Sequence, residues 1–352
     1  MGCVGFVTVT KRPVEELEFS DALKIGCLHS LERLFARHEI PHDTHSVIDM
    51  WEEVAMFGHL HVLEWLNTLI FRFKLTSSDA CQQAARHGHF EVLKWLVANG
   101  CSLEEDTSTT CCLVAESGNL EMLQWVRAAG CSWNEQTCAF AALSGNLEML
   151  QWARANGCPW FPNTCSRAAQ GGHLEVLQWA RANGCPWDET LVNIAAQNGH
   201  EAVVRALIEL GANVNKAMDN GATPLFIAAQ KGNEAVVRAL TELGADINKA
   251  MDNGVTPLGI AAQQGHDMVV RALIELDADV NKAMDEGVTP LFFAALNGQV
   301  AIVRTLIELG ADVNKATDNG WTPLSIAAQR GHRAILQIIR DAVLVQMVNL
   351  SL

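Results

Sequence analysis

A glycine that recurs at nearly regular intervals constrains the fold of this chain more than any other feature. Most copies are followed by His or Asn, and successive copies lie 27 to 33 residues apart. The copies are Gly26, Gly58, Gly88, Gly118, Gly145, Gly172, Gly199, Gly232, Gly265, Gly298 and Gly331. A period in this range indicates one supersecondary unit repeated along the chain, because a single copy cannot bury its own apolar face. The sequence therefore predicts a solenoid whose neighbouring units share a continuous core.

The repeated unit is clearest in residues 248–281. Asp252–Gly254 has the composition of a tight turn. Thr256–Pro257 marks a helix start, because the Thr hydroxyl caps free N–H groups and Pro at the first helical position loses no hydrogen bond. Gly265 ends this short helix, and a second helix with one apolar face is expected from Asp267 to Leu276. Each unit is therefore a turn followed by two antiparallel helices.

The 33-residue units resemble the ankyrin repeat. The motif Thr-Pro-Leu-x-x-Ala-Ala-x-x-Gly-His, followed by Leu-Gly-Ala-Asp-Val-Asn, recurs in register at 223–245, 256–278, 289–311 and 322–332. The resemblance implies an all-α helical-hairpin solenoid with short β-hairpin or turn arms in the C-terminal repeats. The His of the family motif is replaced by Phe226, Gly259, Phe292 or Ser325, and the turn Asp by Met218, Met251, Met284 or Thr317. Because both changes remove hydrogen bonds, we expect looser turns than the family norm.

The first half of the chain has the same pattern in a shorter form. Its 27-residue units, from Gly118 to Gly199, resemble divergent ankyrin repeats in which the arm is reduced to a loop such as 159–163. We therefore expect four segments along the chain. They are an N-terminal cap or disordered start (1–20), divergent short repeats (21–198), consensus-like repeats (199–340) and a C-terminal capping helix or tail (341–352).

Tryptophan recurs in two columns, which allow two interpretations. One column lies on the expected second helices and the other follows a Gly-Cys step. The columns are Trp65, Trp95, Trp125, Trp152 and Trp179, then Trp133, Trp160 and Trp187. An aromatic ladder that stacks on bases or grips a peptide is one interpretation. We favour core between repeats, because the second column aligns with aliphatic core positions such as Ile247, and buried aromatic side chains contribute strongly to packing.

The sequence contains no recognisable catalytic or metal-binding motif. Phosphate-binding loops, nucleophile elbows and the His-Glu-x-x-His motif are all absent. Cys111–Cys112 with His87 and His89 fits no common zinc spacing. The histidines that recur beside the glycine are expected to form structural hydrogen bonds. We therefore expect no enzymatic activity, no metal and no cofactor.

The cysteines and the net charge indicate which cellular compartment and which classes of partner to expect. All eleven cysteines lie at or before Cys185, and several follow the glycine that ends a helix. They are expected to be buried, reduced thiols, which favours an intracellular protein, cytoplasmic or alternatively nuclear. The net charge of −15 disfavours nucleic acid. Charged residues interrupt the apolar stretch 334–352, so no membrane insertion is expected.

The resemblance implies a protein partner, bound along a concave surface of turn tips and first helices. The matching positions are Asp219, Asn220, Ala222, Gln230, Lys231, Asp252, Asn253, Val255, Gln263, Gln264, Asp285, Glu286, Val288, Leu296, Asn297, Asp318, Asn319, Trp321, Gln329 and Arg330. Trp321 is either a binding hot spot or packed on its neighbouring turn. A lysine ladder beside the tips is read as a solvated mixed-charge face rather than a site for an acidic peptide.

The functional hypothesis is a monomeric, non-enzymatic protein–protein interaction module, an adaptor or scaffold. This inference rests on analogy with the family and on the absence of catalytic motifs. Two alternatives stay open. One is a substrate-recognition adaptor in protein turnover, and the other is a fragment of a larger multidomain protein whose catalytic part is absent.

Overall fold

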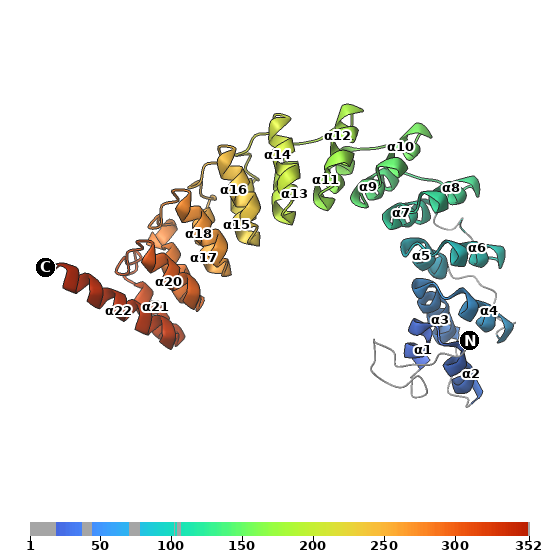
Figure 1. The fold of residues 1–352 in the computed structure, drawn as a ribbon, viewed down its shortest axis with the longest axis horizontal. Coiled ribbons are helices and arrows are strands. Elements are labelled where there is room, and N and C mark those ends of the chain that lie inside the picture. The colour runs from blue at the N-terminus through green and yellow to red at the C-terminus, as the bar shows by residue number, and fades with distance from the viewer. Residues whose placement is uncertain (1–18, 37–43, 70–77, 102, 104–106, 351–352) are drawn as a thin grey trace. The chain divides into compact units, whose positions relative to one another are not determined.

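The computed structural model describes residues 19–36, 44–69, 78–101, 103 and 107–350, and these ranges contain helices, turns and loops but no strand (Figure 1). They form two compact units, residues 1–167 and 168–352. The helical part of the expected fold class is therefore confirmed. Of the expected segments, 1–20 lies almost wholly outside the described residues.

Unit 1 is a series of helical hairpins. Its helices are α1 (Phe19–Ile25), α2 (Leu28–Ala36), α3 (Thr44–Phe57), α4 (Leu60–Leu69), α5 (Ser78–Arg86), α6 (Phe90–Ala98), α7 (Thr107–Ser117), α8 (Leu120–Ala128), α9 (Glu135–Leu143), α10 (Leu147–Ala155) and the first part of α11 (Pro162–Gly171). First helices α3, α5, α7 and α9 pack in sequence, and each contacts its own second helix. Leu63, Leu93, Leu123 and Leu150 occupy one repeated position on the second helices and are fully buried.

Unit 2 continues the same pattern with longer connections. Its helices are the end of α11, then α12 (Leu174–Ala182), α13 (Leu191–Asn198), α14 (Glu201–Glu209), α15 (Pro224–Lys231), α16 (Glu234–Glu242), α17 (Pro257–Gln264), α18 (Asp267–Glu275), α19 (Pro290–Leu296), α20 (Val300–Glu308), α21 (Pro323–Arg330) and α22 (Arg333–Leu350). The first helices α13, α15, α17, α19 and α21 stack on one another, and so do the second helices from α14 to α22. The expected boundary at residue 340 falls inside α22.

The helix starts of the long repeats follow the expected chemistry. Thr256 accepts a 3.1 Å hydrogen bond from the backbone N–H of Gly259, and Pro257 is the first residue of α17. Thr223, Thr289 and Thr322 cap α15, α19 and α21 in the same way. Each capping threonine replaces a hydrogen bond that the first helical turn lacks. The predicted helix start and the left-handed glycine cap at Gly265 are both confirmed.

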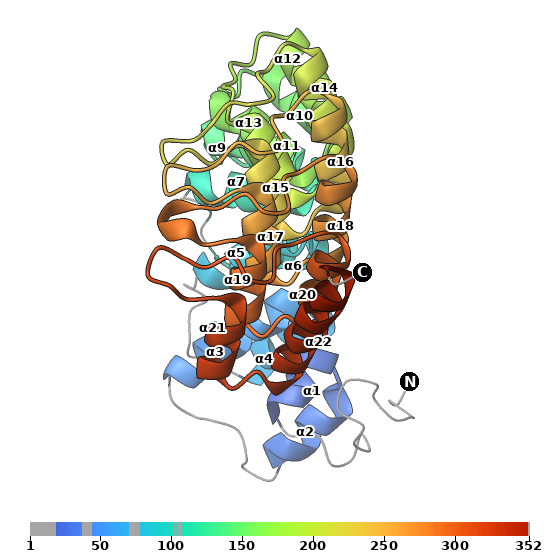
Figure 2. The ribbon, with the colours of Figure 1, turned by 90° about the vertical axis from the view of Figure 1, so that its left-hand side faces the viewer.

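The arms between long repeats are turns, and the expected β-hairpins are not confirmed. The turns project together beside the first helices (Figure 2). Each closes with a backbone hydrogen bond of 2.8–2.9 Å between residues four apart, from Met218 to Ala222, Met251 to Val255, Met284 to Val288 and Thr317 to Trp321. Neighbouring turns share isolated bonds, such as the 3.3 Å bond from Asp252 N to Asn220 O. One isolated bond between turns is too few to make a strand ladder.

The histidines beside the recurring glycine join consecutive repeats. The Nε2 atom of each forms a hydrogen bond with a backbone carbonyl at the end of the preceding first helix. The pairs are His59 with Lys24, His89 with Met56, His200 with Gln170, His266 with Gln230 and His332 with Leu296, at 2.8 to 3.2 Å. The structural role expected for these histidines is confirmed at these five positions.

The described cysteines are all buried, but one expectation about them is wrong. A disulfide joins Cys81 on α5 to Cys101, which follows α6, with the two Cα atoms 7.0 Å apart. The helical hairpin brings these residues together, because the chain reverses between α5 and α6. Cys111, Cys131, Cys138 and Cys158 are free thiols. The expectation of reduced thiols throughout is therefore corrected at Cys81 and Cys101.

Candidate partner-binding surface

The residues expected to bind a partner gather on one surface of unit 2. This surface, called the tip surface below, consists of the turn tips from Met218 to Trp321 and the C-terminal ends of α15, α17, α19 and α21. Most of the expected residues are exposed, whereas Val255, Gln263, Val288 and Leu296 are half-buried. Ala222 differs from the rest, because only 4% of its surface is exposed.

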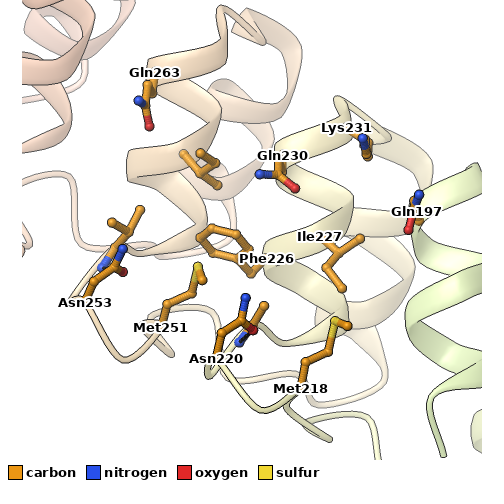
Figure 3. Close-up of a pocket in the computed structure, with 13 residues that line it drawn as sticks. Gln197, Met218, Asn220, Phe226, Ile227, Gln230, Lys231, Met251, Asn253 and Gln263 are labelled. Carbon is orange, nitrogen blue, oxygen red and sulfur yellow. Dashed lines mark hydrogen bonds between the residues drawn. The ribbon is translucent and has the colours of Figure 1, made fainter.

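A pocket of about 400 Å³ opens on the tip surface between α15 and α17 (Figure 3). Phe226, Ile227 and Ile260 are buried on these two helices and line its apolar part. Phe226 is only 4% exposed, so contacts within the protein fix the position of its ring. The pocket therefore offers a preformed apolar floor.

Polar groups and methionines surround this floor. The amide side chains at the pocket are Gln197, Asn220, Gln230, Asn253 and Gln263, and Lys231 is the one charged residue among the thirteen that line it. Met218, on the turn before α15, is 47% exposed, and Met251 lies on the next turn. Amides both donate and accept hydrogen bonds, while methionine side chains adapt to irregular apolar shapes. Such a lining suits binding.

The pocket combines expected and unexpected residues. It brings together seven of the expected positions, namely Asn220, Ala222, Gln230, Lys231, Asn253, Val255 and Gln263. The other expected residues lie elsewhere on the tip surface. Sequence reasoning missed Gln197, Met218, Phe226, Ile227, Met251 and Ile260 as pocket residues. The signal was present, because Met218, Met251 and Phe226 are the positions that depart from the repeat motif.

The lining of the next repeat differs at one glycine. Gly259 stands where the preceding repeat has Phe226. A Cβ atom at Gly259 would lie 2.5 Å from the terminal methyl of Met284. Met284 is therefore buried against the glycine, whereas Met251, which stands in the same relation to Phe226, is half-buried. The Met284 side chain thus occupies space that any larger residue at position 259 would need.

Charges on the tip surface are mostly acidic and exposed. Asp219, Asp252, Asp285, Glu286 and Asp318 lie on the four turns with exposed side chains. Two lysines of the ladder are engaged within the chain. Lys216 forms a 3.2 Å ion pair with Glu189, and Lys315 donates a 3.2 Å hydrogen bond to the carbonyl of Asn281.

The tryptophans differ between the two units. Trp321 is 40% exposed on the last turn, where its backbone N–H donates a 3.1 Å bond to the Thr317 hydroxyl. In unit 1, Trp133 packs edge-on against Trp152 of the next repeat at 5.7 Å, and the Arg127 guanidinium lies 4.0 Å from the Trp133 ring centre. The columns in the short repeats thus contact their own chain and are half-buried.

Neither a metal site nor a membrane-spanning segment is found in the described part of the chain. Within it, no three His, Cys, Asp or Glu side chains are placed to hold one metal ion. None of the helices described is both long and apolar enough to cross a membrane.

Comparison with known proteins gives one positive result. The family model for ankyrin repeats matches three overlapping stretches, 165–251, 246–317 and 283–346, which together cover just over half of the chain. No curated protein matches the chain. The matched stretches include every residue of the tip surface.

Proposed function

Since this chain belongs to the ankyrin-repeat family, whose repeats are generally protein–protein interaction modules, we propose that it is an adaptor or scaffold that binds a partner protein along the tip surface. The observation that carries the proposal is the pocket between α15 and α17. A solvent-accessible pocket with an apolar floor and a polar rim is the usual form of a recognition site.

The lining of the pocket indicates what part of a partner it accepts. Phe226 and Ile260 provide apolar contact for one inserted side chain, and Met218 and Met251 adapt to its shape. Surrounding amides are suited to the backbone N–H and C=O groups on either side of that side chain. The partner is therefore a peptide segment with one apolar anchor residue, the arrangement typical of a binding hot spot.

The charge of the tips adds a preference for the flanking residues. Exposed carboxylates such as Asp219 and Asp252 lie on the same turns as the two methionines. Opposite charges accelerate encounter and fix register at an interface. We therefore expect Lys or Arg beside the apolar anchor in the partner segment.

Affinity capture with matched variants tests the proposal. The pocket variant carries Met218→Arg and Asn253→Arg, both at exposed positions. The control carries Met268→Arg on α18, where Met268 is 61% exposed and lies outside the pocket. A cell lysate is passed over the wild type, the pocket variant and the control, and the retained proteins are identified by mass spectrometry. We expect at least one protein retained by the wild type and the control and lost from the pocket variant.

The contrary result is equally clear. If the folded pocket variant retained the same proteins as the wild type, the pocket would not be the site that binds the partner. Circular dichroism melting establishes that all three proteins are folded. A synthetic peptide scan of the captured partner then tests the predicted anchor, because replacing the apolar residue by Ala should abolish binding to the wild type.

A further inference from the structure

Eight of the eleven cysteines occur as four pairs with one spacing. The two members of each pair are 20 residues apart: Cys81 and Cys101, Cys111 and Cys131, Cys138 and Cys158, Cys165 and Cys185. The first member lies on the first helix of a short repeat, and the second follows the glycine after the second helix. The four short repeats at Gly88, Gly118, Gly145 and Gly172 thus each carry one pair.

The long repeats have apolar residues at both positions. The equivalent pairs, again 20 residues apart, are Val192 and Ala212, Leu225 and Ala245, Leu258 and Ala278, Leu291 and Ala311. Packing is satisfied there without sulfur, so burial alone does not require cysteine. Cysteine occurs at both positions of a repeat or at neither. This joint occurrence indicates a role that needs two thiols together.

The structure brings the two members of each of the first three pairs close together. Cys81 and Cys101 form a disulfide. In the next repeat the thiols of Cys111 and Cys131 lie close enough for each to change the pKa of the other. In the repeat after that, the Cys138 thiol donates to the carbonyl of Cys158 at 3.9 Å, and the Cys158 thiol donates to the carbonyl of Asn134 at 3.4 Å. Consecutive repeats therefore contain one closed and two open forms of the same pair.

The surroundings of Cys131 favour its thiolate. The hydrogen bond from Cys111 and, next, the positive charge of Arg127 lower the pKa of Cys131, although burial opposes them. The same hydrogen bond and burial raise the pKa of Cys111. Arg127 also donates a hydrogen bond to the carbonyl of Cys131 and stacks on Trp133. Cys131 lies in the connection after α8 and is buried, so its reaction requires local opening of that connection.

From this repeated geometry we propose that the three cysteine pairs of unit 1 are dithiol–disulfide sites. Each site closes within its own repeat and links the first helix to the end of the second. Cys81–Cys101 is the oxidised form, while Cys111–Cys131 and Cys138–Cys158 are reduced forms. The oxidant is a small exchangeable disulfide of the glutathione class. This inference is independent of partner binding by unit 2.

The reaction is two successive thiol–disulfide exchanges. The Cys131 thiolate attacks one sulfur of glutathione disulfide, which forms a mixed disulfide and releases one glutathione thiolate. The Cys111 thiol then loses its proton and attacks the Cys131 sulfur. The internal S–S bond forms and the second glutathione thiolate leaves. Two protein thiols have lost two electrons and two protons, and one glutathione disulfide has become two glutathione thiols.

Differential alkylation of the full chain tests the proposal. The reduced protein is equilibrated in glutathione buffers from fully reduced to fully oxidised, quenched with acid, alkylated and digested at glutamate. Cleavage at Glu135 separates Cys131 from Cys138, and fragmentation distinguishes Cys111 from Cys112. We expect linked peptides for Cys111–Cys131 and Cys138–Cys158, with the two thiols of a pair disappearing together. The intact chain loses two hydrogen atoms for each pair that closes.

A variant taken from the chain's own long repeats provides the control. Cys111→Leu with Cys131→Ala copies the Leu–Ala pair and should fold while losing only its own link. In the wild type, closing a pair constrains about 20 residues and should slow hydrogen exchange in α7 by roughly tenfold to a hundredfold. The proposal is overturned if no linked peptide forms at any glutathione ratio at which the chain stays folded. Links formed equally between different repeats would also overturn it.

Discussion

Arg271 on α18 donates a 2.6 Å hydrogen bond from Nη2 to the hydroxyl of Thr305 on α20, so one side chain joins two repeats. The same guanidinium donates to Asp267 at 2.9 Å, and Thr305 donates to Asp267 at 2.7 Å. Arg205 and Arg238 make equivalent links from α14 to α16 and from α16 to α18, through Glu242 and Glu275. A row of arginines thus connects the second helices of unit 2.

The Asp267→Asn substitution should destabilise unit 2 in a pH-dependent way. Burial acts to raise the pKa of Asp267, but the hydrogen bonds from Thr305 and Arg271 outweigh it and lower the pKa below 3.8. The carboxylate therefore stabilises the fold above its unfolded pKa, and this contribution is lost as the pH falls through the folded pKa. At pH 7 we expect a loss of about 1 kcal/mol in urea unfolding. The difference from wild type should shrink as the pH falls through the range in which the folded carboxylate takes up a proton, and a difference that stays constant with pH would contradict the assignment.

The loss of stability caused by removing a single helix cap should be measurable. Thr256 is buried and accepts the bond that caps α17. Thr256→Ala should lower the free energy of unfolding of unit 2 by about 1 to 2 kcal/mol, whereas Thr256→Ser keeps the hydroxyl and should cost less. Equal losses for the two variants, measured by urea denaturation, would show that the methyl group rather than the cap matters.

Substitutions at two glycines of one repeat allow the cost of backbone strain to be measured separately from the cost of a steric contact. Gly232 and Gly244 both have left-handed backbone angles, with φ of 78° and 89°. A Cβ atom at Gly232 would lie 2.7 Å from Nδ1 of His266, whereas one at Gly244 meets nothing within 4 Å. Gly244→Ala should therefore cost about 1 kcal/mol for the backbone alone. Gly232→Ala should cost more, because it also displaces the histidine that bonds Gln230.

Thermal or urea unfolding of both variants, side by side, makes the comparison. A third variant, Gly232→Ala with His266→Ala, removes the steric contact and should recover part of the difference. Equal stability of Gly232→Ala and Gly244→Ala would mean that the histidine moves aside at no cost.

The sequence predicts the helices of this chain well because their signals are local. The cap at Thr256 and the left-handed turn at Gly265 depend on a few neighbouring residues, and both are found where expected. The structural role of His266 was also predictable, since its position recurs with the glycine. The arms were expected as short β-hairpins or turns, and the structure has turns. Strand pairing depends on the neighbouring arm, which a single unit does not reveal.

The pocket and the cysteine pairs depend on contacts between distant residues. Met218 and Met251 belong to different repeats, and their shared pocket arises only when α15 and α17 stack. Gly259 was recognisable as a departure from the motif, but the burial of Met284 against it was not. The spacing of Cys111 and Cys131 was visible in the sequence. Only the folded hairpin shows that residues with this spacing lie close together.

The two units should unfold separately. Contacts in a repeat protein are made between neighbours, so each compact unit has its own cooperative transition. Seven of the ten tryptophans, Trp51 to Trp160, lie in unit 1, so fluorescence reports mainly on that unit while circular dichroism reports on both. We expect the two signals to give different urea midpoints. Gly232→Ala should shift the transition of unit 2 and leave the fluorescence midpoint nearly unchanged, whereas coincident midpoints in the wild type would indicate a single cooperative unit.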